Sequence, residues 1–237
     1  MRISSLSTLA VAAYGALHLA PSIAVAADLR IQVLDQDGDP VPEVAVYAQA
    51  FNTDAALDAS GPQGNHASTT TASAATSPTI MNQRELAFHP HLLIVETGTE
   101  IAFPNEDEVR HHVYSFSAAK QFDLTIDSGS TERPVFDQAG VVTLGCNIHD
   151  GMLAYILVVD TAHFTKTDAD GYAALPGLSP GQFDINVWTP RMAPSKLPVP
   201  AAVDLVSGES HEISFQFDAK LYPPHEHSET SLLWSHY

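Results

Sequence analysis

The sequence predicts an all-β protein. Short runs of alternating apolar and polar residues recur along the chain, separated by turn residues, which is the pattern of half-buried strands. The chain has 13 glycines and 16 prolines to form such turns. Hydrophobic residues make up 45% of its 237 residues, which is enough for one large core or two smaller ones.

Residues 1–27 match a secretory signal peptide. Arg2 provides the positive start, residues 6–20 the apolar core, and residues 24–26 (Ala-Val-Ala) a small-residue cleavage site. The apolar core is too short to span a bilayer and no later stretch is long enough, so we expect no membrane span. We therefore expect cleavage after residue 26 or 27 and export, most simply to the periplasm.

The charge balance is strongly acidic. Ten basic and 28 acidic residues give a net charge of −18, and loss of Arg2 with the signal leaves −19. This charge disfavours nucleic acid, whose phosphates it would repel. It favours a basic partner, although an acidic surface can also serve solubility alone.

Residues 28–50 predict two strands joined by a turn at 35–40. Leu29, Ile31 and Val33 alternate with more polar neighbours, and Val44, Val46 and Ala48 form a second alternating set. Residues 51–79 are rich in alanine, serine, threonine and glycine, and we expect a flexible linker there.

Residues 80–161 predict a further run of short strands. The apolar or alternating stretches are Leu92–Ile94, Ile101–Phe103, His111–Phe116, Phe122–Ile126, Val135–Phe136, Val141–Cys146 and Leu153–Val159.

The only cysteine, Cys146, lies in a pattern typical of a metal site. One cysteine cannot form an internal disulfide, and an exposed thiol would be a liability in an oxidising compartment. His149 and Met152 follow Cys146 at successive three-residue spacings. Thiolate, imidazole and thioether are soft ligands that select copper, and two histidines, a cysteine and a distant methionine are typical of blue-copper sites. His111 and His112 are the two candidates for the second histidine.

Residues 80–161 resemble the cupredoxins, a family of small copper proteins that includes plastocyanin, pseudoazurin and amicyanin. The likeness covers Gly-Thr-x-Ile-x-Phe-x-Asn at 98–105 and Gly-Val-Val-x-Leu-Gly-Cys at 140–146. The Cys-x2-His-x2-Met spacing is most similar to amicyanin. The resemblance implies a Greek-key β-sandwich that binds one copper ion, cycling between Cu(I) and Cu(II), through His111, Cys146, His149 and Met152.

The same resemblance favours His111 over His112 as the upstream ligand. In amicyanin-like sequences the ligand comes six residues after an asparagine and just before Asn-Val, and Asn105 places His111 there. His112 then replaces the family's second asparagine, whose side chain ties the two ligand loops together. Asn147 is a candidate for a substitute tie. We also expect Ile148, Leu153 and Phe116 to bury the site.

A second resemblance concerns the segments on either side of residues 80–161. Asp-x-x-Gly-x-Pro-Val at 35–41 and Thr-Asp-x-x-Gly-Tyr at 167–172, followed by Pro-Gly-x-Phe at 180–183, resemble transthyretin-like or carboxypeptidase-regulatory sandwiches. This implies one Ig-like sandwich built from 28–50 and 162–218, with the cupredoxin segment inserted in a loop. We expect 28–50 to pack on 162–218 and not on the copper segment. The alternative is an N-terminal arm followed by two tandem domains.

Residues 219–237 form a polar tail that carries His225, His227 and His236.

The sequence offers no motif for catalysis. It has no Ser-His-Asp set, phosphate loop, haem CxxCH or zinc cysteine pairs, so we expect no enzyme. The likeness to periplasmic cupredoxins called methylamine-utilisation proteins favours an electron carrier with a basic partner, such as a cytochrome c or a periplasmic dehydrogenase. That partner would approach an edge around His149 that Gly151, Met152 and Leu153 leave free of charge, although Asp150 intrudes there. The alternatives are a copper-delivery module without redox turnover and a β-rich periplasmic scaffold.

Overall fold

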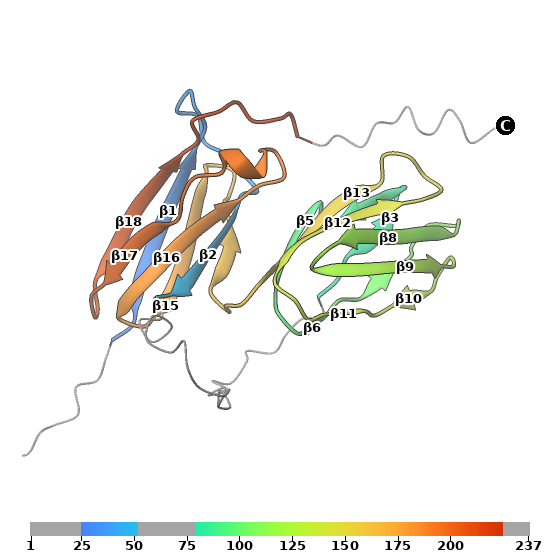
Figure 1. Cartoon of the computed structure of the whole chain (residues 1–237), viewed down its shortest axis with the longest axis horizontal. Coiled ribbons are helices and arrows are strands. Elements are labelled where there is room, and N and C mark those ends of the chain that lie inside the picture. The colour runs from blue at the N-terminus through green and yellow to red at the C-terminus, as the bar shows by residue number, and fades with distance from the viewer. Residues whose placement is uncertain (1–24, 52–78, 225–237) are drawn as a thin grey trace, which may run out of the picture.

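The computed structural model describes residues 25–51 and 79–224 (Figure 1). Within these ranges the regular structure is all strand except for one short 3-10 helix, η2 (Pro194–Lys196), which confirms the all-β class. No helix among the described residues is long and apolar enough to cross a membrane. The predicted signal sequence up to residue 24, nearly all of the 51–79 linker and the histidine-bearing end of the tail lie outside the described residues.

One group of strands forms two sheets around a shared core. A three-stranded sheet has the order β15-β1-β18, where β1 is Ala27–Leu34, β15 is Tyr172–Leu178 and β18 is Ser210–Gln216. A four-stranded sheet has the order β14-β2-β16-β17, where β14 is Phe164–Lys166, β2 is Ala45–Ala50, β16 is Gly181–Trp188 and β17 is Ala201–Leu205. Their facing side chains make one buried cluster that includes Ile31, Val46, Ile185 and Phe215.

Strand β1 shows how the sequence determines this core. Leu29, Ile31 and Val33 are buried while the residues between them face outward, as the alternation predicts. The strand begins at Ala27, within the expected signal region, and Ala27 is fully buried. The predicted turn follows, and the Asp35 carboxylate accepts the backbone N–H groups of the two aspartates that come two and four residues later.

The other group of strands comes from residues 80–159. Its main sheet has the order β5-β13-β12-β8-β9, where β5 is Leu92–Glu96, β13 is Leu153–Val159, β12 is Gly140–Cys146, β8 is His111–Ser117 and β9 is Lys120–Ile126. The facing layer consists of three short pairs. These are β3 (Asn82–Arg84) with β4 (Ala87–His89), β6 (Thr99–Glu100) with β11 (Val135–Phe136), and β7 (Phe103–Pro104) with β10 (Thr131–Glu132). A second buried cluster lies between these layers and includes Phe88, Phe103, Phe136, Leu144 and Ile156.

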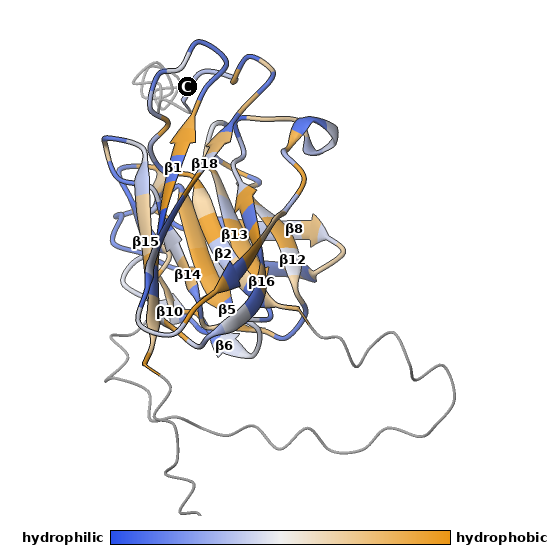
Figure 2. Ribbon diagram, turned by 90° about the vertical axis from the view of Figure 1, so that its left-hand side faces the viewer, coloured by the Kyte–Doolittle hydropathy of each residue, from blue (hydrophilic) through white to orange (hydrophobic). Residues whose placement is uncertain are grey.

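A third apolar cluster joins the two groups. Leu92, Ile94, Leu157 and Val159 of β5 and β13 are buried together with Ala45 of β2. The half-buried rings of Tyr47, Tyr155, Phe164 and Trp188 pack around them. Figure 2 shows the hydrophobic residues that run along β2, β5 and β13. Strands β1 and β2 pair with strands of residues 162–218, as expected. The expectation that residues 28–50 avoid the copper segment is wrong, because β2 also packs on β5 and β13. Strand β13 is apolar on both of its faces and needs a cover on each.

Candidate metal centre

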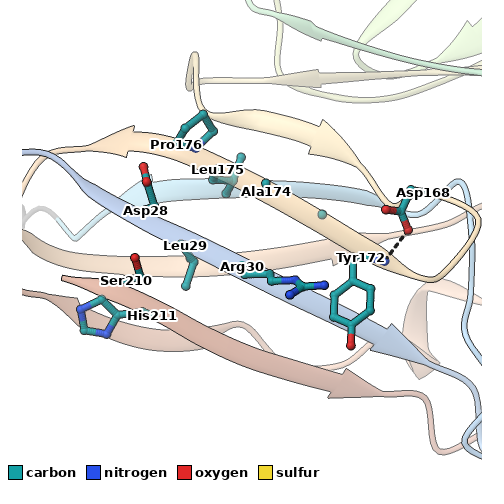
Figure 3. Close-up of a pocket in the computed structure, with 11 residues that line it drawn as sticks. Asp28, Leu29, Arg30, Asp168, Tyr172, Ala174, Leu175, Pro176, Ser210 and His211 are labelled. Carbon is teal, nitrogen blue, oxygen red and sulfur yellow. Dashed lines mark hydrogen bonds between the residues drawn. The ribbon is translucent and has the colours of Figure 1, made fainter. Parts of the chain in front are cut away.

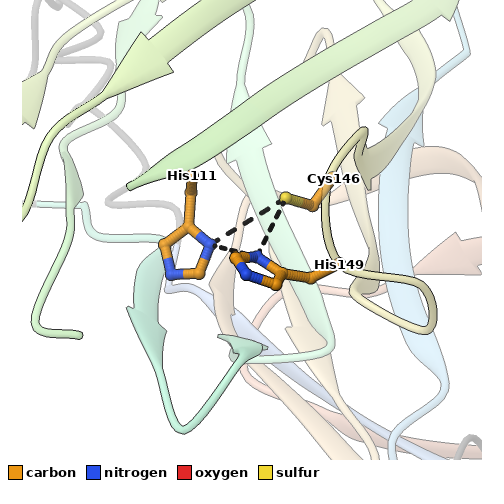
Figure 4. Close-up of side chains that lie close together, drawn as sticks. All are labelled: His111, Cys146 and His149. Carbon is orange, nitrogen blue, oxygen red and sulfur yellow. Dashed lines mark hydrogen bonds between the residues drawn. The ribbon is translucent and has the colours of Figure 1, made fainter. Parts of the chain in front are cut away.

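Two adjacent strands, β8 and β12, and the loop after β12 bring three donor side chains together (Figure 4). His111 is the first residue of β8 and Cys146 is the last residue of β12, with Cys146 in register with Val113. The loop from β12 to β13 returns His149 toward both, and Gly151 at φ +91° allows the tight reversal. Asn147 donates its backbone N–H to the His112 carbonyl at 3.0 Å, which holds the loop against β8.

The separations between the donor atoms fit one metal ion. The Nδ1 atoms of His111 and His149 lie 3.0 Å apart, and the Cys146 Sγ lies 3.9 Å from the first and 3.6 Å from the second. Nitrogen and sulfur ligands bound at about 2.0–2.3 Å from a shared ion would stand roughly 3–4 Å from one another. Among the described residues this is the one group of three or more histidine, cysteine or carboxylate donors with metal-site spacing.

Asp107 orients His111. The His111 ring is fully buried, and its Nε2 donates to Asp107 Oδ2 at 2.8 Å. A proton on Nε2 leaves the Nδ1 lone pair free and aimed at Cys146 and His149, which is the tautomer that a metal ligand needs. The same carboxylate accepts the backbone N–H groups of Glu85 at 2.7 Å and Leu86 at 3.1 Å. Asp107 therefore ties the first ligand to the β3–β4 turn, where both of those residues have positive φ.

Asn105 shapes the loop that leads to His111. It is 2% exposed, and its side-chain amide donates to the carbonyls of Val109 at 2.8 Å and Ile126 at 3.0 Å. Its Oδ1 accepts the backbone N–H of Asp107 at 3.0 Å. The asparagine six residues before His111 thus fixes both the loop and the carboxylate that orients the ring.

The surroundings of Cys146 favour the thiolate. Burial raises the pKa of the Cys146 thiol, but the hydrogen bond with His111 and three backbone N–H groups outweigh it, so the pKa is lowered overall. Those N–H groups belong to His112, Ile148 and His149. A soft metal binds the deprotonated sulfur, so the chain prepares this ligand before any metal arrives.

The pKa values of the two ligand-candidate histidines, His111 and His149, are shifted in opposite directions. Burial lowers the pKa of His111, whereas its hydrogen bonds and charge interactions with Cys146 and Asp107 raise it, and the net shift is upward. The pKa of His149 is lowered by burial and by the charge of His111, with Asp107 acting weakly in the other sense. His149 therefore stays neutral down to a lower pH than His111 does, and its neutral ring can bind a metal through Nδ1.

Met152 lies in the same buried cluster as Cys146 and is 3% exposed. Its backbone N–H donates to the His149 carbonyl at 3.4 Å, which closes the turn that follows the ligand loop. Met152 therefore cannot belong to the expected solvent-facing edge. The exposed apolar residues next to the ligands are instead Val109 and Ile148, at 44% and 53% exposed.

His112 lies away from the three donors. Successive residues of a strand face opposite sides, so the His112 ring points outward, where its Nε2 contacts the Asp123 carboxylate. The Nδ2 of Asn147 lies 3.4 Å from the other ring nitrogen, so Asn147 and His112 do link the two ligand segments. Asp107 was missed from the sequence, although a carboxylate four residues before a ligand histidine is a signal that could have identified it.

The expected apolar cover of the site is wrong in part. Phe116 is 79% exposed and Ile148 is 53% exposed, and only Leu153 is half-buried. Cys146 is nevertheless only 7% exposed, because it belongs to the buried cluster between the two layers of strands.

A concave surface, apart from the metal centre, lies on the outer face of the β15-β1-β18 sheet (Figure 3). It measures about 420 Å³. Its carboxylates serve the backbone, since Asp168 accepts the N–H of Tyr172 at 2.9 Å and Asp28 accepts that of Gly177 at 3.1 Å. Arg30 stacks over the Tyr172 ring at 3.9 Å. These contacts stabilise the sheet face and assemble no reactive group.

No protein-family model matches the chain, and no curated protein matches it. Solved structures do show likenesses to part of it. A Cu(I) form of an amicyanin variant matches with 16% sequence identity and a TM-score of 0.33, covering 36% of this chain and 86% of amicyanin. A copper-containing nitrite reductase from Thermus scotoductus matches with 24% identity and a TM-score of 0.34, covering 36% of this chain and 23% of the reductase.

Proposed function

We propose that this chain is a periplasmic mononuclear copper protein that transfers single electrons and catalyses no reaction of its own. The observation that carries the proposal is the meeting of one thiolate and two imidazole nitrogens within 4.8 Å of one another. Soft sulfur and imidazole donors select copper, and this donor set with a nearby methionine is typical of blue-copper sites. Bound copper would supply the Cu(I)/Cu(II) couple.

The chain's own residues would keep the geometry constant between the two oxidation states. His111 and Cys146 are held at the ends of two paired strands, and Asp107 fixes the His111 ring. Three backbone N–H groups point at the sulfur and stabilise its negative charge. Donors that are fixed before the metal arrives need little movement when one electron is added or removed, which favours fast transfer.

His149 offers the route to the surface, because it is the one donor of the three that is not buried. Val109 and Ile148 provide exposed apolar surface close by in the chain. The net charge of −18 favours a basic partner, such as a cytochrome c or a periplasmic dehydrogenase. The signal pattern at residues 1–27 supports export to the periplasm.

The test is the visible spectrum of the protein loaded with Cu(II). We expect an intense thiolate-to-copper charge-transfer band that is lost in Cys146→Ser and in His149→Ala. His112→Ala is the matched control and should keep the band, because that ring faces away from the donors. A Cu(II) form with only weak absorption would contradict electron transfer and favour the delivery module. Failure to bind copper at all would favour the scaffold.

A further inference from the structure

A cleft lies where the two groups of strands meet. It measures about 290 Å³, which is close to the lower end of the range for small-molecule sites, and such sites often occur at domain interfaces. One wall belongs to the group that carries the metal centre and the other wall to the opposite group. The residues that line it are His91, Leu153, Tyr155, Pro190, Arg191, Tyr222, Pro223 and Pro224. We call it the Arg191 cleft.

The cleft carries positive charge in a strongly acidic protein. Among the residues that line it none is acidic, and Arg191 is the permanent cation. Arg110 and Arg133 each pair with a carboxylate, whereas Arg191 forms no ion pair with any residue that the structure describes. The chain has 28 acidic residues and 10 basic ones, so an arginine without a carboxylate is conspicuous. Arg191 is therefore placed to bind a negative group from outside the chain.

Hydrogen bonds hold the Arg191 guanidinium in one orientation. Its Nε donates to the Tyr222 carbonyl at 2.9 Å, and the backbone N–H of Tyr222 donates to the Arg191 carbonyl at 2.7 Å. The two Nη groups make no hydrogen bond within the described part of the chain. A planar guanidinium that is fixed through Nε presents its Nη groups as a fork, and this fork matches the two oxygens of a carboxylate.

Flat and largely apolar side chains form most of the remaining lining. Tyr155 and Tyr222 contribute aromatic rings, and Pro190, Pro223 and Pro224 contribute the faces of their own rings. Tyr222 is 59% exposed, so a ligand in the cleft would cover apolar surface that the chain itself leaves open. Aromatic rings prefer planar partners that stack on them or meet them edge-on. The lining therefore fits one planar ring that bears a carboxylate.

The wall on the side of the metal centre is attached to the ligand loop. His91 Nδ1 donates to the Leu153 carbonyl at 3.0 Å, and Leu153 directly follows Met152. The His91 ring also packs edge-on against Tyr155, with 5.5 Å between the ring centroids. A ligand in the cleft would thus contact the end of the ligand loop and the opposite group of strands at the same time.

We propose that the Arg191 cleft binds a small aromatic carboxylate. The two carboxylate oxygens accept hydrogen bonds from the Nη groups of Arg191, and the ring packs against Tyr155 and Tyr222. This site is distinct from the metal centre and requires no bound metal, so it stands independently of the proposed electron transfer.

The first experiment titrates three probes into the ¹⁵N-labelled, copper-free full chain and records amide shifts. Benzoate has both the ring and the charge, benzamide has the ring without the charge, and acetate has the charge without the ring. We expect benzoate to shift the amides of Leu153, Tyr155, Arg191 and Tyr222, and to bind about tenfold more tightly than either other probe. Equal binding of benzamide, equal binding of acetate, shifts centred elsewhere or no shifts would each overturn the proposal.

The second experiment repeats the benzoate titration with variants. Arg191→Gln should weaken benzoate binding about tenfold, because the charged fork is lost. Arg133→Gln is the matched control and should leave the affinity unchanged, because Arg133 pairs with Glu100 at 3.8 Å and does not line the cleft. Equal losses in the two variants would show that the overall charge attracts benzoate, and would overturn the site.

A third variant tests the ring contact without disturbing the arginine. Tyr222→Ala keeps both hydrogen bonds with Arg191, because these involve the backbone of Tyr222. It should weaken benzoate binding about fivefold and leave acetate binding unchanged. Unchanged benzoate binding in either Arg191→Gln or Tyr222→Ala would overturn the proposal. Urea unfolding of each variant identifies any loss of binding that comes from a loss of fold, and Tyr222→Ala then remains the deciding variant.

Discussion

Replacing Asp107 by alanine would remove one carboxylate that serves three donors. It accepts His111 Nε2 at 2.8 Å and the backbone N–H groups of Glu85 and Leu86 at 2.7 and 3.1 Å. The Asp107 side chain is only 13% exposed, and the His111 side chain is fully buried. Water can reach the turn more easily than the ring, because Glu85 is exposed and Leu86 is half-buried. The main loss therefore falls on the histidine.

The size of the effect follows from these contacts. A buried donor left without its partner costs about 1–3 kcal/mol, and hydrogen bonds to a charged group contribute about 1.5–3 kcal/mol. With the two turn contacts partly replaced by water, we expect Asp107→Ala to lower the free energy of unfolding of the copper-free protein by about 2–4 kcal/mol. The partner that orients a metal-ligating histidine typically changes metal affinity by about 10- to 100-fold, and we expect a loss in that range for copper.

Asp127→Ala is the matched control. Asp127 pairs with Arg110 at 2.5 Å, but the two side chains are 61% and 62% exposed, so the pair should contribute no more than about 1 kcal/mol. The assays are urea unfolding of the copper-free proteins and competitive copper titration. If Asp107→Ala destabilises no more than Asp127→Ala and binds copper as tightly as the unmodified protein, the orienting role of Asp107 is refuted.

Three further outcomes are expected. In the copper-free protein the ultraviolet absorption of the Cys146 thiolate should appear at lower pH than in the unfolded chain. Because the folded pKa is the lower one, this thiolate stabilises the fold fully above the unfolded pKa, and the contribution is lost as pH falls through the folded pKa. The isolated segment 80–161 should self-associate in light scattering while the full chain does not, since Leu157 and its neighbours lose their cover. Electron exchange with a cationic cytochrome should slow as salt rises and exchange with an anionic one should accelerate, whereas flat rates would assign the acidic surface to solubility alone.

Local patterns in the sequence predicted much of the strand structure. Alternation identified β1 because one face of that strand meets a core and the other meets solvent. The three-residue spacings from Cys146 to His149 and Met152 indicated a metal-binding loop, because donors so close in sequence must also lie close together in space. The continuous apolar run of β13 is also typical of a strand that is covered on both faces. This pattern could have predicted the contact between the two groups of strands.

Other features depend on contacts that no local pattern contains. The β3–β4 hairpin was not predicted, because its strands are three residues long and its turn places Glu85 and Leu86, not glycine or asparagine, at positive φ. Its link to His111 through Asp107 joins positions 22 residues apart along the chain. Phe116 was expected to shield the metal site, but it lies five residues after His111 in the same strand, so it faces the opposite side and is exposed.

The double cover of β13 also bears on how the molecule unfolds. The strand leaves the ligand loop at Leu153, and its second half is buried on one side among residues 81–158 and on the other against β2 and β16. Neither group of strands can open without exposing apolar surface of the other, so the two should melt in one cooperative transition. A metal ion bound at the start of this strand would stabilise both groups by mass action, because it binds only the folded state. The strands that carry no ligand would then be protected against local unfolding by an ion that they never contact.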